Sequence, residues 1–129
     1  MKFYNNFSDK PLISIGLPTF NRPKELISCV ENLLNQTYKN IEIIIVDNNS
    51  TNKEYSTIFN NHLFTDSRIK VYKNKTNIGV LKNAQKVLSY AKGEYFCWVS
   101  NDDWRSDKFI ENLFNDIYSL GEGNIVFCK

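Results

Sequence analysis

Two spacings of apolar residues alternate along the chain, and together they predict short strands separated by helices. Several short runs have the length and the β-branched or aromatic content of strands. Between these runs, apolar residues recur every three or four positions, as on the buried face of a helix. The predicted strands cover residues 12–17, 41–46, 69–73, 95–99 and 124–128, and the predicted helices cover residues 23–34, 51–59, 80–91 and 107–120.

Local signals support three of the predicted helices. Asn21 is a good N-cap residue, and Pro23 suits the first helical turn. Thr51, followed three residues later by Glu54, fits a capping box. The helix at 80–91 is expected to bury a stripe formed by Val80, Leu81, Ala84, Val87, Leu88 and Ala91.

The repeated order of strand and helix predicts an α/β fold on a mainly parallel, doubly wound sheet. Right-handed crossovers between parallel strands place helices on both faces of such a sheet. Residues 41–46 are apolar apart from Glu42, as expected for a strand that is covered on both faces. We expect a single domain over residues 1–129. Because the last predicted strand has no covering helix, we expect this domain to be truncated.

Polar side chains follow three of the predicted strands at the point where each strand ends. These segments are Pro18–Asn21, Asp47–Ser50 and Ser100–Asp103. The carboxyl ends of parallel strands meet at one edge of the sheet, where open α/β sheets bind their ligands. We therefore expect an aromatic ring, several hydrogen-bond acceptors and two adjacent carboxylates to lie at the same edge.

Asp102 and Asp103 repel each other unless a positive charge lies between them. A divalent cation that carries phosphate oxygens would relieve this repulsion. An isolated Asp-Asp pair is more often a turn or a helix cap, but the other two polar strand ends favour the cation. Together the three segments suit a nucleotide diphosphate. Because the sequence has neither a P-loop nor a Gly-x-Gly-x-x-Gly motif after the first strand, phosphate binding would depend on the metal.

Composition narrows the classes of partner. The 16 Lys and Arg residues exceed the 14 Asp and Glu residues by only two and form no dense block, so nothing favours nucleic-acid binding. No apolar run approaches the length of a transmembrane segment. Cys29, Cys97 and Cys128 lack metal-ligand spacing and are expected to be free thiols, and His62 is expected at the surface. We therefore expect a cytoplasmic protein.

Five stretches of the sequence, taken together, resemble the N-terminal half of the family 2 glycosyltransferases. They are SIGLPTFNR at 14–22, NQTY at 35–38, EIIIVDNNST at 42–51, NIG at 77–79, and the segment from GEY to DDW at 93–104. The stretches follow the order of the family and cover about residues 12–118. The resemblance implies a Rossmann-like GT-A fold for transferases of nucleotide-diphospho-sugars.

The resemblance also implies an activity, namely the inverting transfer of a sugar from a nucleotide-sugar to an acceptor hydroxyl. A UDP-sugar is the favoured donor. By position, Pro18, Thr19 and Phe20 would line the pocket for the base and the ribose. Asp47 would accept a hydrogen bond from the base.

The remaining assignments come from the same resemblance. Asn77, Gly79 and Asn83 would lie beside the nucleotide. Asp103 would bind Mn²⁺ or Mg²⁺ at the diphosphate, and Asp102 would lie near the ribose or the metal.

The chain departs from the family pattern in two respects. Ser100 occupies a position where many members have the first Asp of a longer acidic motif, although serine also occurs there. The catalytic base of the family lies well downstream, so we expect it beyond residue 129 and assign no catalytic residue to this chain. Neither Glu94 nor Asp107 has motif support as a base. The chain alone is expected to be inactive.

The resemblance leaves the acceptor open between a glycan and a lipid-linked sugar. Many members act in polysaccharide biosynthesis at the inner face of a membrane, and the full-length protein would be peripheral there. Two other functions stay open. One is a receiver-like signalling domain, although such a site needs an acidic pair directly after the first strand. The other is a non-catalytic, nucleotide-sugar-binding or self-associating fragment, which would form a homodimer through its exposed last strand.

Several single residues have a structural alternative. Phe20 would pack in the core instead of lining a pocket. Asn77 and Gly79 would form a turn in which Gly79 supplies a positive φ. Trp104 is expected to anchor the acidic segment by packing, rather than to form a platform for a sugar.

Overall fold

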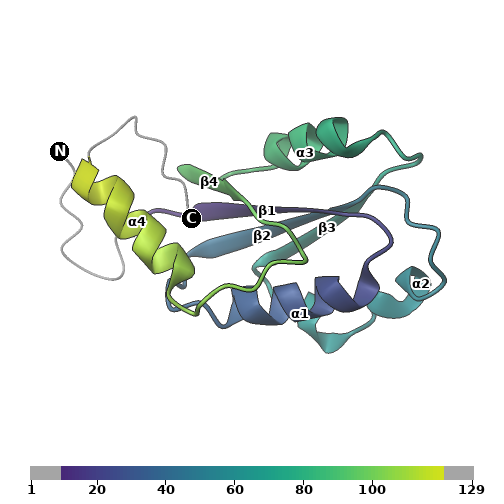
Figure 1. Ribbon diagram of the computed structural model, residues 1–129, viewed down its shortest axis with the longest axis horizontal. Coiled ribbons are helices and arrows are strands. Elements are labelled where there is room, and N and C mark those ends of the chain that lie inside the picture. Colours follow the sequence, from purple (N-terminus) through teal and green to yellow (C-terminus); the bar gives the residue numbers. More distant parts are fainter. Residues whose placement is uncertain (1–9, 121–129) are drawn as a thin grey trace.

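The computed structural model describes residues 10–120, which form a four-stranded sheet flanked by helices (Figure 1). Each predicted strand in this range is confirmed to within two residues. The strand predicted at 124–128, with Cys128, lies outside the described residues. The elements are β1 (Ile13–Thr19), α1 (Pro23–Leu34), β2 (Ile41–Asp47), α2 (Tyr55–Ile58), the 3-10 helix η2 (His62–Thr65), β3 (Ile69–Lys73), α3 (Val80–Ser89), β4 (Tyr95–Trp98) and α4 (Phe109–Leu120).

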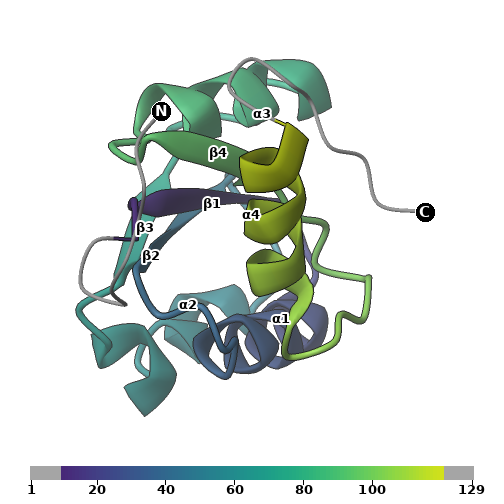
Figure 2. The ribbon, with the colours of Figure 1, turned by 90° about the vertical axis from the view of Figure 1, so that its left-hand side faces the viewer.

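The strands pair in the order β3-β2-β1-β4, and every pair is parallel. In the register of the sheet, Ile13 of β1 lies opposite both Ile41 of β2 and Tyr95 of β4. Helix α3 covers one face, and α1 and α2 cover the other (Figures 1 and 2). The predicted α/β fold with helices on both faces of a parallel sheet is therefore confirmed. Because all strands are parallel, their carboxyl ends share one edge.

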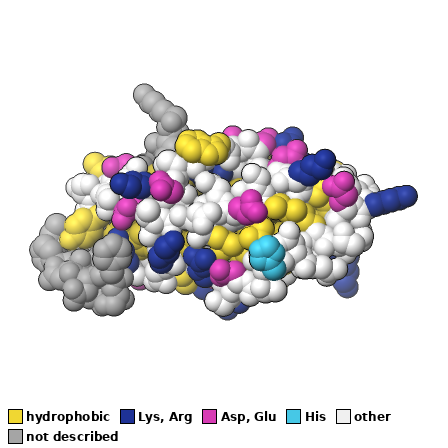
Figure 3. All heavy atoms as spheres, turned by 90° about the horizontal axis from the view of Figure 1, so that it is seen from below, with side chains coloured by type: hydrophobic (Ala, Val, Ile, Leu, Met, Phe, Trp, Pro, Cys, Tyr) yellow, Lys and Arg dark blue, Asp and Glu magenta, His cyan; other side chains and the backbone are white. Residues whose placement is uncertain are grey.

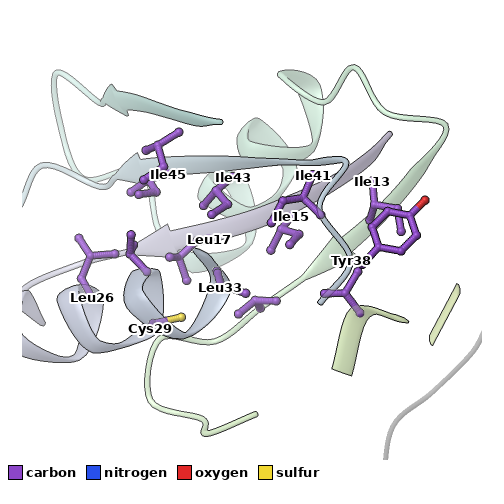
Figure 4. Close-up of a cluster of buried hydrophobic side chains, with 14 of the residues drawn as sticks. Ile13, Ile15, Leu17, Leu26, Cys29, Leu33, Tyr38, Ile41, Ile43 and Ile45 are labelled. Carbon is purple, nitrogen blue, oxygen red and sulfur yellow. The ribbon is translucent and has the colours of Figure 1, made fainter. Parts of the chain in front are cut away.

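The larger core lies on the face of the sheet that α1 covers (Figure 4). Alternate residues of β1 and β2 contribute to it, since successive side chains of a strand point to opposite faces. Each aliphatic side chain that is fully buried there contributes about 1.5–3 kcal/mol relative to an exposed one. At one end of this core, Phe114 of α4 packs on Tyr38 with 5.3 Å between the ring centroids. The buried residues labelled in Figure 4 are Ile13, Ile15, Leu17, Leu26, Cys29, Leu33, Tyr38, Ile41, Ile43 and Ile45.

The core under α3 is much smaller, and its buried members are Ile44, Val46 and Val87. Gly16 of β1 is needed here, because a Cβ at this position would lie 2.6 Å from Val87 Cγ1 and closer still to the ring of Phe96. The apolar stripe predicted to be buried on α3 is wrong for three of its residues, Val80, Leu81 and Leu88.

Helix α3 buries Asn83 and Val87 against the sheet. This orientation leaves Val80 and Leu81 each 80% exposed, and Leu88 is exposed as well. The sequence pattern identified the helix but misplaced the face that it buries, because a buried asparagine takes a position that apolar periodicity assigns to a polar face.

Two predicted helix caps are also wrong. Asn21 has a positive φ of 54°, and its side chain accepts hydrogen bonds from the backbone N–H groups of Thr51 and Asn52, at 2.8 and 2.9 Å. The N-cap of α1 is Arg22, without a side-chain cap. Glu54 is the N-cap of the short helix α2 and forms no capping box. The side-chain amide of Asn21 thus joins two loops instead of capping α1.

The surface agrees with the expectations from composition. Lys, Arg, Asp and Glu are interspersed on the face shown in Figure 3, where His62 is exposed. Cys29 is a buried free thiol, and Cys97 is half-buried. Of the helices in residues 10–120, none has the length and apolarity that a membrane crossing requires.

Candidate functional site

The ends of β1, β2 and β4 meet at a cleft of about 660 Å³ at the carboxyl edge of the sheet. Of the residues predicted to form a site, this cleft brings together Pro18, Thr19, Phe20, Asn83 and Asp103. The other predicted residues do not line it. The remaining lining residues are Arg22, Asn48, Val80, Ala84, Trp98, Val99, Ser100 and Asn101.

The end of β1 is held by a buried tyrosine. The hydroxyls of Thr19 and Tyr55 share a hydrogen bond of 2.5 Å, and the Tyr55 hydroxyl also accepts from the backbone N–H of Arg22 at 3.3 Å. Burial raises the pKa of Tyr55, so the phenol stays protonated near neutral pH. Phe20 is 41% exposed and lines the cleft, which places it outside the core. The β1 end therefore presents an aromatic ring on a fixed backbone.

Asp47, at the end of β2, is completely buried. Its Oδ1 accepts hydrogen bonds from the backbone N–H and the hydroxyl of Ser50, at 2.9 and 2.5 Å. Its Oδ2 is buried and accepts no hydrogen bond within the described part of the chain. The ammonium group of Lys73 lies 3.7 Å from this oxygen, on a side chain that is 56% exposed. One carboxylate oxygen is thus fixed by the loop, and the other keeps its acceptor capacity.

Asn48 connects three segments of this edge. Its Nδ2 donates to Asn77 Oδ1 at 2.9 Å, and its Oδ1 accepts from the Ile78 N–H and from Asn74 Nδ2, each at 3.0 Å. Its backbone N–H donates to the carbonyl of Thr19 at 2.9 Å. The loops after β1, β2 and β3 are therefore joined through one buried asparagine.

The predicted nucleotide-binding residues of α3 and of the loop before it belong to the same network. Asn83 is buried, donates to the Val46 carbonyl at 3.1 Å and accepts from Asn74 Nδ2 at 2.8 Å. Asn77 Oδ1 accepts from the Gly79 N–H at 2.9 Å. Gly79 has a φ of 83°, which L side chains rarely adopt. The turn at 77–79 is therefore confirmed, and Asn83 lies at the cleft with both ends of its amide occupied.

The acidic loop, Ser100–Asp103, follows β4. Asp102 accepts a hydrogen bond from the Ser100 hydroxyl and forms an ion pair with the Arg22 guanidinium, at 2.5 Å. These two contacts, the serine first, lower the pKa of Asp102 below its usual value. The ion pair joins the loops after β1 and β4 across 80 positions of the sequence.

Asp103 is the more accessible of the two carboxylates, with a side chain that is 68% exposed. Its Oδ2 lies 3.7 Å from Nη2 of Arg105, which is buried. The Asp103 side chain borders the cleft and two further hollows of about 390 and 730 Å³. A carboxylate in this position is open to a cation from solvent.

The structure contradicts the packing role predicted for Trp104. Its side chain is 85% exposed, so it does not anchor the acidic loop by burial. The sequence could not show this, because an aromatic residue beside a polar loop is as compatible with a core as with a surface.

The described residues fit a divalent cation only in part. Among residues 10–120, no group of three or more His, Cys, Asp or Glu side chains is placed to hold a metal ion. Mg²⁺ typically keeps several waters and binds one or two carboxylates together with substrate phosphates. Asp103, with Asp102 next to it, supplies oxygen ligands of this kind. The donor set thus fits an ion that arrives with a diphosphate.

Several residues that build the edge carry no clear signal in the sequence. Asn48 lies in a polar segment that was noted, but nothing indicated that its side chain would link three loops. Tyr55 and Asn74 lie outside the motifs. Arg105 lies two positions after the acidic pair, and no role was predicted for it.

Comparison with protein families identifies the chain. The model of "Glycosyl transferase family 2" matches residues 14–128. This match covers well over half of the sequence, and the chain therefore belongs to glycosyl transferase family 2.

Curated relatives agree with this assignment. The glycosyltransferase GlyG of Streptococcus pneumoniae serotype 4 is 38% identical over 106 residues, which cover 82% of this chain and 35% of the relative. An uncharacterized glycosyltransferase of Haemophilus influenzae is 34% identical over 122 residues, or 92% of this chain and 48% of the relative. The chain thus spans between a third and a half of the length of these relatives.

Solved structures share the fold. A mannosyltransferase, PcManGT from Pyrobaculum calidifontis, solved with GDP-Man and Mn²⁺, has a TM-score of 0.72 at 19% identity, and the match covers 84% of this chain and 32% of that one. TarS 1–349 of S. aureus, solved with UDP, has a TM-score of 0.69 at 23% identity and coverages of 81% and 32%. The predicted GT-A fold is confirmed by these neighbours.

Proposed function

We propose that this member of glycosyl transferase family 2 forms the donor-binding half of an inverting glycosyltransferase. It would bind a nucleotide-sugar, with a UDP-sugar favoured, for transfer to an acceptor hydroxyl. The observation that carries the proposal is the cleft at the carboxyl edge, which joins the Thr19–Phe20 segment to Asp103. An aromatic ring, fixed hydrogen-bonding groups and an exposed carboxylate in one concave site suit a nucleotide diphosphate.

The base would be recognised by Asp47. Its Oδ2 accepts no hydrogen bond within residues 10–120, while its Oδ1 is held by Ser50. A carboxylate oxygen can accept a hydrogen bond from the ring N–H of uracil or guanine, a donor that adenine and cytosine lack. The ammonium group of Lys73 lies near this oxygen, on a side chain that is half-exposed, so the bound base would displace the lysine side chain. Phe20 and Pro18 would contact the base and the ribose.

The diphosphate would lie at the acidic loop. Asp103, with Asp102 near it, would hold Mn²⁺ or Mg²⁺, and the ion would neutralise the charge that develops on the leaving diphosphate. Arg22 keeps Asp102 in place from the β1 side. Asn77, Gly79 and Asn83 would shape the wall of the nucleotide site through the asparagine network.

The acceptor hydroxyl would attack the anomeric carbon from the face opposite the diphosphate, which inverts the configuration in one displacement. No carboxylate at the cleft is assigned as the base that removes the hydroxyl proton. We propose that this base, like the acceptor site, belongs to a part of the enzyme beyond residue 129. Residues 1–129 alone would bind the donor without catalysing transfer of its sugar.

The experiment that tests this proposal is a calorimetric titration with UDP, with and without Mn²⁺. We expect binding that Mn²⁺ strengthens at least about tenfold, an effect of about 1.4 kcal/mol. Asp103→Asn should remove the increment due to Mn²⁺, whereas Glu31→Gln, an exposed carboxylate on the last turn of α1, should keep it. Absence of UDP binding to the wild type, with or without Mn²⁺, would contradict the proposal.

The base preference can be tested in the same way. UDP and GDP should bind. ADP and CDP should bind at least about tenfold more weakly, because their bases lack the ring N–H from which Asp47 would accept a hydrogen bond. Equal affinity for all four diphosphates would show that the site recognises only phosphate. That result would leave the metal-dependent diphosphate site and remove the role of Asp47.

A further inference from the structure

We propose that Arg105 is a positioning residue that holds the acidic loop in the shape required for the metal and the diphosphate. The inference rests on the proposed function, because it assigns to Arg105 the support of Asp103. Arg105 does not line the position of the base, and its guanidinium is buried beneath the loop. Its effect on the donor would pass through the loop alone.

The contacts of Arg105 connect both ends of the acidic loop. Its Nη2 donates to the Ser100 carbonyl at 2.8 Å, and its Nη1 donates to the Asp103 carbonyl at 2.9 Å. One planar guanidinium thus fixes the first and last residues of a four-residue loop. Lysine could not do the same, because its single ammonium lacks the rigid fork that reaches two acceptors at a set separation.

The same arginine ties the loop to the core. The side chain of Asn32 on α1 donates to the Arg105 carbonyl at 2.8 Å, and Arg105 Nη1 lies 3.9 Å from the sulfur of Cys29. Its guanidinium also lies over the ring of Phe109, 5.7 Å from the centroid. The acidic loop therefore takes its position from α1 and from the start of α4.

The charge of Arg105 also suits the loop. A buried cation requires a nearby negative charge, and Asp103 Oδ2 lies 3.7 Å from Nη2. This distance is too long for a hydrogen bond, and the Asp103 side chain is largely exposed. The arginine therefore offsets the repulsion between Asp102 and Asp103 while it leaves the Asp103 carboxylate open to a second partner.

The test compares the wild type with Arg105→Lys, Arg105→Met and the matched control Arg68→Met. Arg68 also forms an ion pair, with Asp66 at 2.9 Å, but directly before β3 at the opposite edge of the sheet. Each chain is titrated with uridine and with UDP, with and without Mn²⁺. Backbone order parameters of residues 100–103 are measured by NMR relaxation without ligand, and thermal unfolding confirms that each variant folds.

We expect the order parameters of the acidic loop to fall from about 0.85 in the wild type to below about 0.6 in Arg105→Met, with Arg105→Lys between them. The Mn²⁺-dependent gain in UDP affinity should fall about 10- to 100-fold, as for other residues that support a metal ligand. Uridine affinity should stay within about twofold, because the contacts proposed for the base are with Asp47, Phe20 and Pro18. Arg68→Met should change neither quantity.

Two results would overturn the inference. One is a folded Arg105→Lys or Arg105→Met chain whose loop keeps the wild-type order parameters. The other is a parallel loss of uridine and UDP affinity, which would indicate a general structural role. If the wild type binds no UDP, the proposed function fails, and the NMR comparison still decides whether Arg105 orders the loop.

Discussion

The two acidic segments at the carboxyl edge of the sheet are built in opposite ways. Asp47 is completely buried, and its own loop satisfies one of its oxygens through Ser50. Asp102 and Asp103 are exposed, and the loop that carries them is held in part by contacts with α1 and the loop before it, which are distant in the sequence. Both segments follow parallel strands of one sheet, so the difference comes from the loops and not from the fold.

Because of this difference, the Asp47 segment can select a ligand through a hydrogen bond, whereas the Asp102–Asp103 segment can exchange cations with solvent. A buried carboxylate with one unused acceptor oxygen can select a single N–H donor, since a wrong partner would leave it unsatisfied. An exposed pair of carboxylates exchanges cations with solvent, which a site for an ion and a diphosphate needs. A site of this type combines a rigid segment that recognises the base with an exposed segment that binds a cation and the diphosphate.

The largest expected effect is a loss of uridine affinity on substitution of Asp47, which substitution of Asp103 should not cause. Asp47→Asn replaces the free acceptor oxygen with an amide that can donate, so the base loses a hydrogen bond to a charged group, worth about 1.5–3 kcal/mol. We expect uridine affinity to fall about 10- to 100-fold in a calorimetric titration. Asp103→Asn should leave uridine affinity unchanged and remove only the Mn²⁺-dependent part of UDP binding.

Both substitutions keep the size of the side chain, so each serves as the control for the other. A fall in uridine affinity in Asp103→Asn that equals the fall in Asp47→Asn would show that the two segments act as one site. The proposed separation between base recognition and charge exchange would then be wrong.

The second effect concerns the stability of the asparagine network. Asn48→Ala removes one buried side chain that donates to Asn77 and accepts from Asn74 and Ile78. Leaving such groups unpaired costs about 1–3 kcal/mol. The measurement is the free energy of unfolding from urea titration.

The neighbouring residue supplies a matched control. Asn49 has a φ of 62°, a conformation that glycine adopts readily. Asn49→Gly should therefore change the free energy of unfolding by less than about 0.5 kcal/mol. If both substitutions cost the same, the stability of this edge would not depend on the Asn48 hydrogen bonds.

Much of the fold could be predicted from the sequence because each strand has a local signature. The run Ile41–Val46 is apolar enough to require cover on both faces, and the structure buries all of it. The order of strands and helices then leaves few parallel arrangements. The face of α3 could not be predicted, because a hydrogen-bonded Asn83 occupies a buried position that hydrophobic periodicity reserves for apolar residues.

The candidate site divides in the same way. The loops that end in Asp47 and Asp103 were found because strand ends at one edge must converge. Residues that support this edge were missed. Tyr55 holds the β1 end through a contact between distant segments, and Arg105 lies outside the motifs and is itself held by Asn32, which is distant in the sequence. Asn21 shows the reason: its residue type suits a helix cap, but its side chain satisfies the backbone of a loop about 30 residues away.

The third effect is a shift in titration. The Ser100 hydroxyl and, after it, Arg22 lower the pKa of Asp102, so Ser100→Ala should raise it toward the usual value of about 3.9. Because the pKa in the folded state is depressed, the stabilisation from these contacts is present above the usual pKa and is lost as the pH falls through the depressed value. An NMR titration of the side-chain carboxyl carbon measures the midpoint directly.

Asp66 is the control for this titration. Hydrogen bonds from Arg68 lower its pKa to about 2, and Ser100→Ala should leave that value in place. Arg22→Gln should also raise the pKa of Asp102. A midpoint for Asp102 that does not respond to Ser100→Ala would show that the serine is not its main partner.

The smallest expected effect tests whether the acidic loop is held only from its buried side. Trp104 is 85% exposed, so Trp104→Phe should change the free energy of unfolding by less than about 0.5 kcal/mol. Trp98 donates a hydrogen bond to the Ala84 carbonyl at 3.2 Å, and Trp98→Phe should cost about 0.5–1.5 kcal/mol. Urea unfolding of the two variants gives the comparison. A cost for Trp104→Phe that matches the cost for Trp98→Phe would mean that the indole also supports the loop from the solvent side.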